Sequence, residues 1–340
     1  MLSYIKVAGS PFEAGRILGR FGAEAAHSYL IHSRSWASVM LWRGTSEVRA
    51  MVALTEQHFP LILEELTGLS AGLDLPFEDV FLWNCRGDVW AMAADGCTTV
   101  QLPQEHGARI AHNEDGDPAF TGFCGIAQVS IVGGLDFASF VYPASIPGHA
   151  FAVNEAGLAM TVNNLRSREV SVGLPRMVLT RALLEQTSLT DAVALLSHLP
   201  KAGGFHLSLA QQGRDELLSV EFNGFGVSAE VLQAPGLHAN HATHLLMRDF
   251  PQVITDSSLH RQLRGNSLLG VAPNCVNPLA ILQDQYNAQF PIYRDDPDDS
   301  DGENTMATVD IHIGKDGVVW QVYERPGQPA RFEFMNEKLA

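Results

Sequence analysis

The chain has 340 residues, 46% of them hydrophobic, and a formal net charge of -16. This size is ample for a large core in one domain or in two closely packed ones. The acidic balance argues against a nucleic-acid phosphate backbone and against an anionic membrane surface as partner, and it fits a protein acting on small molecules. No stretch approaches the roughly 18 uncharged apolar residues of a membrane span.

The cysteines and the beginning of the chain indicate the compartment. Cys85, Cys97, Cys124 and Cys275 are scattered without a Cys-x-x-Cys pair, which suggests neither a zinc site nor a disulfide framework. Residues 1–22 contain charged residues and glycines throughout and no apolar run of signal-peptide length. We therefore expect a reducing, cytoplasmic setting, with no metal or other cofactor.

The first 96 residues are predicted to be mostly helical. Ser10 to Glu13 form a capping box with proline at the first helical position, so a helix is expected from there to about Tyr29. Further helices are expected over residues 47–67 and 76–92. This helix-rich segment is followed by a β-rich one.

After residue 97 short apolar runs alternate with turn signals, which indicates a series of strands. Neighbouring strands joined by short turns imply antiparallel sheets. Helices before, between and after the strands then predict an α+β layered sandwich. The expected strands are 98–102, 109–112, 126–132, 137–142, 151–153, 158–162, 205–211, 217–222, 226–232, 305–313 and 318–323, and the expected helices are 176–186 and 191–199, the second with Thr190 as N-cap.

Three other patterns were weighed as sites. The acidic segment 295–303 suggests a calcium loop, but an EF-hand register places Pro297 where a carboxylate is required, so a solvated surface loop is expected. Gly68 to Gly72 match the Gly-x-Ser-x-Gly elbow of an α/β-hydrolase, with Ser70 as nucleophile, but the residues before it read as a helix end. His238, His241 and His244 make a metal site conceivable, although a polar loop is favoured.

Cys97 is the most informative residue, because it lies where the helical segment gives way to strands, in the sequence Gly96-Cys97-Thr98-Thr99. Cleavage of the Gly96–Cys97 bond would give the cysteine a free α-amine. That amine has a reference pKa near 7.7–8.0 and could act as a base for the thiol. On spacing alone, however, a cysteine after a glycine is an ordinary buried small hydrophobe.

Polar residues at predicted strand ends could complete a site around this cysteine. Two strands joined by a tight loop would return Asp115 beside Cys97, where it could hold the amine or thiol proton. A polar turn is the ordinary alternative. Asn163 and Asn164 end a strand, and alternation lets only one of them face the core. Asn240 follows another strand, and amides in such places can donate to an oxyanion.

Taken together, these motifs resemble the isopenicillin N acyltransferase family (acyl-coenzyme A:6-aminopenicillanate acyltransferase), autoproteolytic members of the N-terminal nucleophile hydrolases. The resemblance covers nearly the whole chain. It rests on four matches in register: Gly96-Cys97-Thr98-Thr99 as the self-cleavage site, Asn113-x-Asp115, Asn154-x-x-Gly157-Leu158 leading to Asn163, and Asn240-His241.

The resemblance implies a four-layer αββα sandwich of antiparallel sheets and self-cleavage into segments 1–96 and 97–340, which together form one compact unit. Cys97 would be both the autocatalytic and the hydrolytic nucleophile. Asp115 would orient its amine, and Asn240 with Asn163 would line the oxyanion site.

Two positions qualify this assignment, and Asn113 and His112 are expected only to support the site. Penicillin V acylases and bile-salt hydrolases have an arginine three residues before the aspartate, where this chain has His112, which weakens any claim for their substrates. Arg261 is a candidate for the catalytic arginine, although a structural ion-pair partner is the simpler interpretation.

The predicted function is a cysteine amide hydrolase or N-acyltransferase that acts on a small N-acyl amide through a Cys97 thioester. Acyl-coenzyme A is a candidate donor, and neither nucleic acid nor membrane is expected as partner. The alternative is a relative that keeps the fold, is not processed and serves as a binding protein. A denaturing gel separates the two, because only the enzyme would appear as two fragments.

Overall fold

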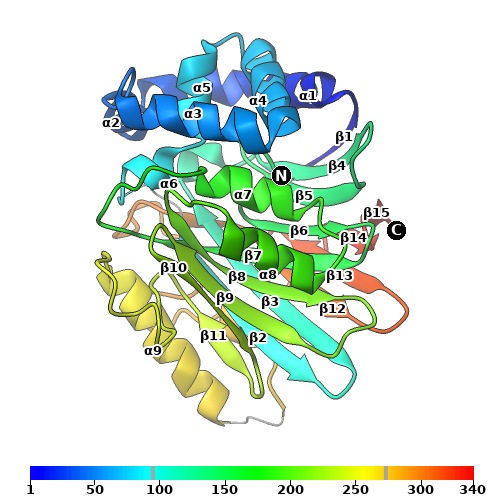
Figure 1. Cartoon of the computed structure of the whole chain (residues 1–340). Helices are drawn as coiled ribbons and strands as arrows, with labels where there is room; N and C mark the ends of the chain where they lie inside the picture. Colours follow the sequence, from blue (N-terminus) through cyan, green and yellow to red (C-terminus); the bar gives the residue numbers. More distant parts are fainter. Residues whose placement is uncertain (93–95, 272–274) are drawn as a thin grey trace.

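The computed structural model describes residues 1–92, 96–271 and 275–340. In these residues the chain forms two large sheets with helices packed around them (Figure 1). The described part of the chain contains no helix that is long and apolar enough to cross a membrane. Both sheets contribute to the surroundings of Cys97.

The first segment is mostly helical, as predicted, but it begins with a strand that the sequence pattern does not predict. Ser10 caps α1 by accepting a hydrogen bond from the backbone of Glu13, which confirms the predicted start of the helix, while the Glu13 carboxylate accepts from Arg16. The helix expected over 47–67 is two helices, because Pro60 lacks the N–H that would continue the first. The elements are β1 (Ser3–Gly9), α1 (Pro11–Ser28), the 3-10 turn η1 (Leu30–His32), α2 (Arg34–Met40), α3 (Ser46–His58), α4 (Pro60–Leu73), α5 (Phe77–Trp83) and α6 (Arg86–Val89).

The glycines around Ser70 pack helices together. A β-carbon at Gly68 would lie 2.0 Å from the carbonyl oxygen of Phe12 in α1, so α1 and α4 touch backbone to backbone. Ser70 lies inside α4, and its hydroxyl donates to the carbonyl of Leu75. The strand–turn–helix geometry of a nucleophile elbow is therefore absent at Ser70, and the α/β-hydrolase alternative is wrong.

The strands form one eight-stranded and one seven-stranded sheet within the described residues. β1 pairs parallel with β4, and every other described pair is antiparallel. The first sheet has the order β1, β4 (Gly125–Ile131), β5 (Phe137–Val141), β6 (Phe151–Asn154), β7 (Leu158–Leu165), β8 (Gly204–Gln211), β9 (Leu217–Asn223), β10 (Gly226–Val231). The second has the order β11 (Gly236–His238), β2 (Gly96–Gln104), β3 (Gly107–Gly116), β12 (Asn304–Ile313), β13 (Val318–Tyr323), β14 (Phe332–Met335), β15 (Lys338–Leu339).

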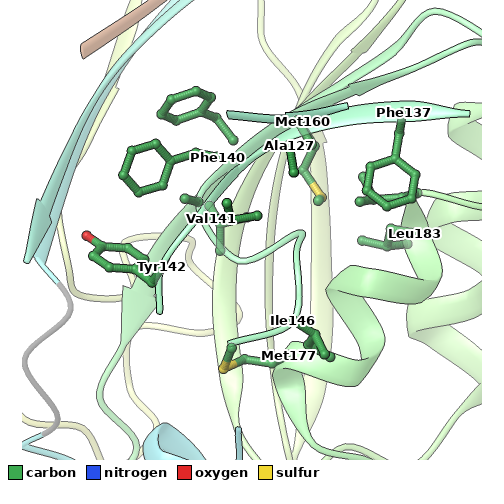
Figure 2. Packing of buried hydrophobic residues seen from close by; sticks show 14 of the residues in the cluster. Ala127, Phe137, Phe140, Val141, Tyr142, Ile146, Met160, Met177 and Leu183 are labelled. Carbon is green, nitrogen blue, oxygen red and sulfur yellow. The ribbon is translucent and has the colours of Figure 1, made fainter. Parts of the chain in front are cut away.

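Helices flank the two sheets, and the arrangement is compatible with the predicted layered sandwich. α7 (Arg176–Leu183) and α8 (Leu189–His198) pack on the eight-stranded sheet, and α8 is capped by Ser188 rather than by Thr190. Figure 2 shows Phe137 of β5 beside Leu183 of α7. On the seven-stranded sheet lie α9 (Asp256–Val271), seen beside β11 in Figure 1, and α10 (Pro278–Leu282); a 3-10 turn, η2 (Pro118–Phe120), follows β3.

The space between the two sheets has two chemically different parts. The aromatic part consists of Phe140, Phe151, Trp320 and Phe334, whose rings stack or meet at centroid distances of 4.2 to 6.3 Å. The polar part consists of Thr99, Gln101, His112, Asn163 and His206, all of them buried. Thr99 of β2 donates to Asn163 of β7, so hydrogen bonds join the two sheets here.

Candidate active site

Cys97 is the second residue of β2, and its side chain is buried at 3% exposure. Asn240 contacts two of its atoms. The backbone N–H of Cys97 donates to Oδ1 of Asn240 at 3.0 Å, and Nδ2 of Asn240 donates to the Cys97 sulfur at 3.0 Å. The two atoms that would act as nucleophile and base are thus held by one amide.

The position of Asn240 follows from the strand before it. β11 pairs with the start of β2, with His238 opposite Thr99, so Asn240, the second residue after β11, lies beside Cys97. The backbone N–H of Asn240 donates to Oγ of Ser258 in α9 at 2.8 Å. Asn240 therefore follows the edge strand β11 and is held in place by a side chain of α9.

Arg261 of α9 binds the same cysteine from the backbone side. Nη1 donates to the carbonyl of Cys97 at 2.5 Å and to the hydroxyl of Thr98 at 2.8 Å, and Nη2 donates to Oδ1 of Asn240 at 2.7 Å. Burial lowers the pKa of Arg261. Among the described residues Arg261 forms no ion pair, so its contacts here are the hydrogen bonds to Cys97, Thr98 and Asn240, and its catalytic role stays a prediction.

Asp115 is close to Cys97 along the sheet but does not bind it. It is the cross-strand partner of Gly96, and its Oδ1 accepts a hydrogen bond from Thr305 at 2.7 Å. Burial raises the pKa of Asp115, while Arg294 and Arg261 lower it. Asn113, two residues earlier, donates to the carbonyl of Leu282, the last residue of α10, and to the carbonyl of Ile292. The predicted neighbourhood is present, and direct contact between Asp115 and the thiol is not.

Asn163 does not contact the thiol either. Its Oδ1 accepts from Thr99 and His206, and its Nδ2 donates to the carbonyl of His238. The residue that reaches Cys97 is Asn164, through its backbone N–H. A backbone donor leaves no signature in the side-chain pattern, and the only hint in the sequence is that a strand ends here.

The thiol lies in a small pocket. Among the described residues that shift its pKa, Arg261 is the one cation. Burial raises the pKa of Cys97 well above its usual range, and Glu114, whenever it is ionised, raises it further. The Asn164 N–H, Asn240 and Arg261 act in the opposite direction. The pocket is lined by Gly96, Cys97, Glu114, His149, Val162, Asn164 and Phe205. The thiol therefore needs a proton acceptor before it can attack.

A buried ionic cluster flanks Gly96 on the other face of β2. Glu303 is 1% exposed, and a β-carbon at Gly96 would lie 2.1 Å from its Oε2. Arg294 donates to that oxygen at 2.7 Å and also pairs with Asp299, while Arg166 lies 3.5 Å from Oε1. Burial raises the pKa of Glu303 to about 7. Most of the 295–303 loop is exposed, as predicted, but its last residue, Glu303, turns inward and is buried beside Gly96.

The three late histidines belong to the polar interior. His238 bonds Glu221 at 2.8 Å, His244 bonds Ser219 at 2.8 Å, and His241 bonds Ser258 at 2.7 Å. Across the described ranges, no group of three or more histidine, cysteine or carboxylate side chains could hold a metal ion.

Comparisons with known proteins give the family. The family model described as acyl-coenzyme A:6-aminopenicillanic acid acyl-transferase matches residues 103–328, a range that begins after Cys97 and includes Asp115, Asn240 and Arg261. The acyl-coenzyme A:6-aminopenicillanic-acid-acyltransferase 40 kDa form of Emericella nidulans is 27% identical over 203 residues, covering 57% of this chain and 55% of that protein. The match thus spans about half the length of the relative. This chain belongs to the acyl-coenzyme A:6-aminopenicillanic acid acyltransferase family.

Proposed function

We propose that this chain is a self-processing cysteine enzyme of the N-terminal nucleophile class, with the αββα sandwich of that class. It cleaves its own Gly96–Cys97 bond and then hydrolyses or transfers the acyl group of a small N-acyl amide. The observation that carries the proposal is that the side chain of Asn240 forms hydrogen bonds with both the nitrogen and the sulfur of Cys97. Segments 1–96 and 97–340 are the two products.

In the cleaved enzyme the α-amine of Cys97 is the base. It receives the thiol proton as the sulfur attacks the amide carbonyl, and it returns that proton to the leaving amine. Asn240 Nδ2, which donates to the sulfur, and the Asn164 N–H, which lowers the pKa of the thiol, replace the expected pair of Asn240 and Asn163 as oxyanion donors. Arg261 fixes the Cys97 carbonyl, and Asp115 contributes negative charge to the same side of the sheet.

The acceptor of the acyl group decides between hydrolysis and transfer. Water attacking the thioester gives a hydrolase, and an amine gives an acyltransferase. The family description supports transfer, with acyl-coenzyme A as the candidate donor and a 6-aminopenicillanic acid-like amine as the candidate acceptor. A thiol ester such as acyl-coenzyme A exchanges readily with the Cys97 thiolate, because both sides of the exchange are thioesters.

Self-cleavage is the first test. Intact mass and a denaturing gel of wild-type protein should show fragments of 96 and 244 residues, with Cys97 at the new N-terminus. Cys97→Ala should remain full length and inactive, and Cys97→Ser should cleave slowly because an alkoxide is harder to form than a thiolate. Full amide turnover by wild-type protein whose Cys97 nitrogen is still acylated would overturn the mechanism. A single inert full-length band would favour the binding relative.

A further inference from the structure

Self-cleavage requires a proton acceptor for the thiol that is not the α-amine of Cys97. In the uncleaved chain the nitrogen of Cys97 is part of a peptide bond, so it cannot accept a proton. The thiol is buried, and its pKa is raised. A second proton acceptor must therefore lie on the thiol side of β2.

Glu114 is the carboxyl group on that side. It is opposite Cys97 in the β2–β3 register. The N–H and carbonyl of Cys97 both bond away from β3, to Asn240 and Arg261, so Cys97 and Glu114 form a non-hydrogen-bonded pair, the arrangement in which cross-strand side chains come closest. The two residues also line the same pocket.

Hydrogen-bond directions determine where the protons lie next to Glu114. Nδ2 of Asn163 donates to a backbone carbonyl, so its Oδ1 faces Thr99 and can only accept. The single proton of Thr99 is thereby committed to Asn163. The contact of 2.8 Å between Thr99 Oγ1 and His112 Nδ1 must then use a proton on Nδ1.

His112 consequently presents its other nitrogen as an acceptor. In the neutral ring Nε2 carries a lone pair, and it lies 3.0 Å from Oε2 of Glu114. That contact requires the proton between them to come from the carboxyl group of Glu114. Burial lowers the pKa of His112 to about 3, which agrees with a neutral ring in the resting protein.

We propose that His112, acting through Glu114, accepts the thiol proton of Cys97 during self-cleavage. This role rests on the proposed function. The sulfur proton passes to the carboxyl group of Glu114 as the Oε2 proton passes to Nε2 of His112. The thiolate attacks the Gly96 carbonyl carbon, the carbon–nitrogen bond breaks, and the relay returns the proton to the Cys97 nitrogen. Water then hydrolyses the thioester to a Gly96 carboxylate, and the new α-amine takes the water proton.

Thr99 and Asn163 are positioning residues in this scheme, because they hold His112 in the tautomer that can accept a proton. Within the described residues, the titratable groups that face Glu114 include Cys97 on β2, His112 on β3, Cys124 before β4, and His149 in the shared pocket. Once the α-amine exists, it replaces the relay. The relay is therefore needed for cleavage and is largely dispensable for turnover.

The test compares the two steps in full-length protein. Chains synthesised in a cell-free system are sampled over time on denaturing gels for the cleavage rate, and the cleaved product is assayed for turnover per alkylatable Cys97. Glu114→Gln can still donate to Nε2 of His112 but cannot relay a proton. Its cleavage should slow by about 10²-fold or more, the usual contribution of general acid–base catalysis, and cleavage should fall about tenfold or more further than turnover does.

Thr99→Val and Thr99→Ser test whether cleavage depends on the His112 tautomer with its proton on Nδ1, even if Glu114→Gln fails to fold. Valine removes the acceptor for Nδ1 and should slow cleavage about tenfold or more, and serine, which keeps the hydroxyl, should restore it. Glu65→Gln is the matched control, since Glu65 is an equally buried carboxylate bonded to Arg181 and should cleave at the wild-type rate.

The outcomes separate the two proposals. Wild-type cleavage rates in Glu114→Gln and Thr99→Val would overturn the relay and leave self-processing intact. Equal losses of cleavage and turnover in Glu114→Gln would also overturn it, because the relay would not be specific to the precursor. A wild-type chain that never cleaves would overturn the proposed function itself.

Discussion

The aromatic and polar parts of the interior lie between the same two sheets and are equally hidden from water, yet they are built in opposite ways. Apart from the indole N–H of Trp320, which donates to the carbonyl of Asn336, the aromatic rings need no hydrogen-bond partners, so mainly their shape decides how they pack. Each side chain of the polar part needs a donor or acceptor, because an unpaired buried polar group destabilises the fold. The presence of such a network beside Cys97 indicates that the polar part orients the side chains of the site, while the aromatic part stabilises the fold.

The largest expected effect is a loss of stability on substitution in the aromatic part. Trp320 is fully buried, stacks on Phe334 at 4.2 Å and donates its indole N–H to the carbonyl of Asn336. Trp320→Ala should lower the free energy of unfolding by about 3–5 kcal/mol, the usual range for a buried aromatic. Urea denaturation in a Cys97→Ala background measures this. The folded fraction of the otherwise wild-type variant should keep its turnover, and loss of turnover without loss of stability would contradict the division.

The next effect concerns catalysis. Asn240→Ala removes a donor aimed at the reacting centre, and turnover per cleaved molecule should fall about 10²–10³-fold. Stability should fall as well, by about 1–3 kcal/mol, because Arg261 and the Cys97 N–H lose a buried acceptor. Steady-state kinetics and thermal melting of the same preparation separate the two effects.

Asn163→Ala is the matched comparison for Asn240→Ala, because Asn163 is equally buried but does not reach the thiol. It should lose a similar amount of stability and keep turnover within severalfold once cleaved. Equal losses of turnover in the two variants would show that the polar part acts as one unit.

A smaller effect concerns pH. Burial raises the pKa of Glu303 from 4.5 to about 7, although Arg294 and Arg166 oppose the shift. The folded protein holds this proton more tightly than the unfolded chain, so the stabilising contribution is complete below pH 4.5 and is lost as the pH rises through about 7. Glu303→Gln cannot ionise, so its stability should decline less over that interval. Chemical denaturation at several pH values in a Cys97→Ala background tests this, and parallel declines would contradict the shift.

The smallest expected effect concerns Cys275, whose modification should leave turnover unchanged. Cys275 is exposed, whereas Cys85, Cys97 and Cys124 are buried and have raised pKa values. A thiol alkylator should modify Cys275 first without loss of turnover, and inactivation should follow modification of Cys97. Peptide mapping by mass spectrometry gives the order, with Cys275→Ser as control. A serine-directed phosphonate should have no effect, and inhibition with label at Ser70 would contradict the cysteine mechanism.

Sequence patterns predict the parts of this molecule that depend on neighbours in the chain. The N-cap at Ser10 and the β2–β3 hairpin are both local, and the hairpin places Asp115 near Cys97. β11, which brings Asn240 beside Cys97, lies outside the predicted strands, because its partner β2 precedes it by more than a hundred residues. β1 escapes prediction because its partner β4 begins more than a hundred residues later.

The remaining site residues depend on long-range packing. Arg261 reaches the Cys97 carbonyl only because α9 lies against β11, and Glu303 reaches Gly96 only because its loop folds inward. Alternation correctly separates Asn163 from Asn164, but it cannot show that a backbone N–H, rather than an amide side chain, faces the sulfur.

The parallel pairing of β1 with β4 has a consequence for the processed protein. β1 belongs to the segment before Gly96, and β4 belongs to the segment after it, so seven residue pairs from Ser3 to Gly9 bridge the two products. The Glu65–Arg181 ion pair crosses the same divide in a buried position. Cleavage would thus yield a strand-complemented heterodimer that migrates as one particle under native conditions. Refolding would then require two separate chains to associate, so the melting temperature would depend on protein concentration.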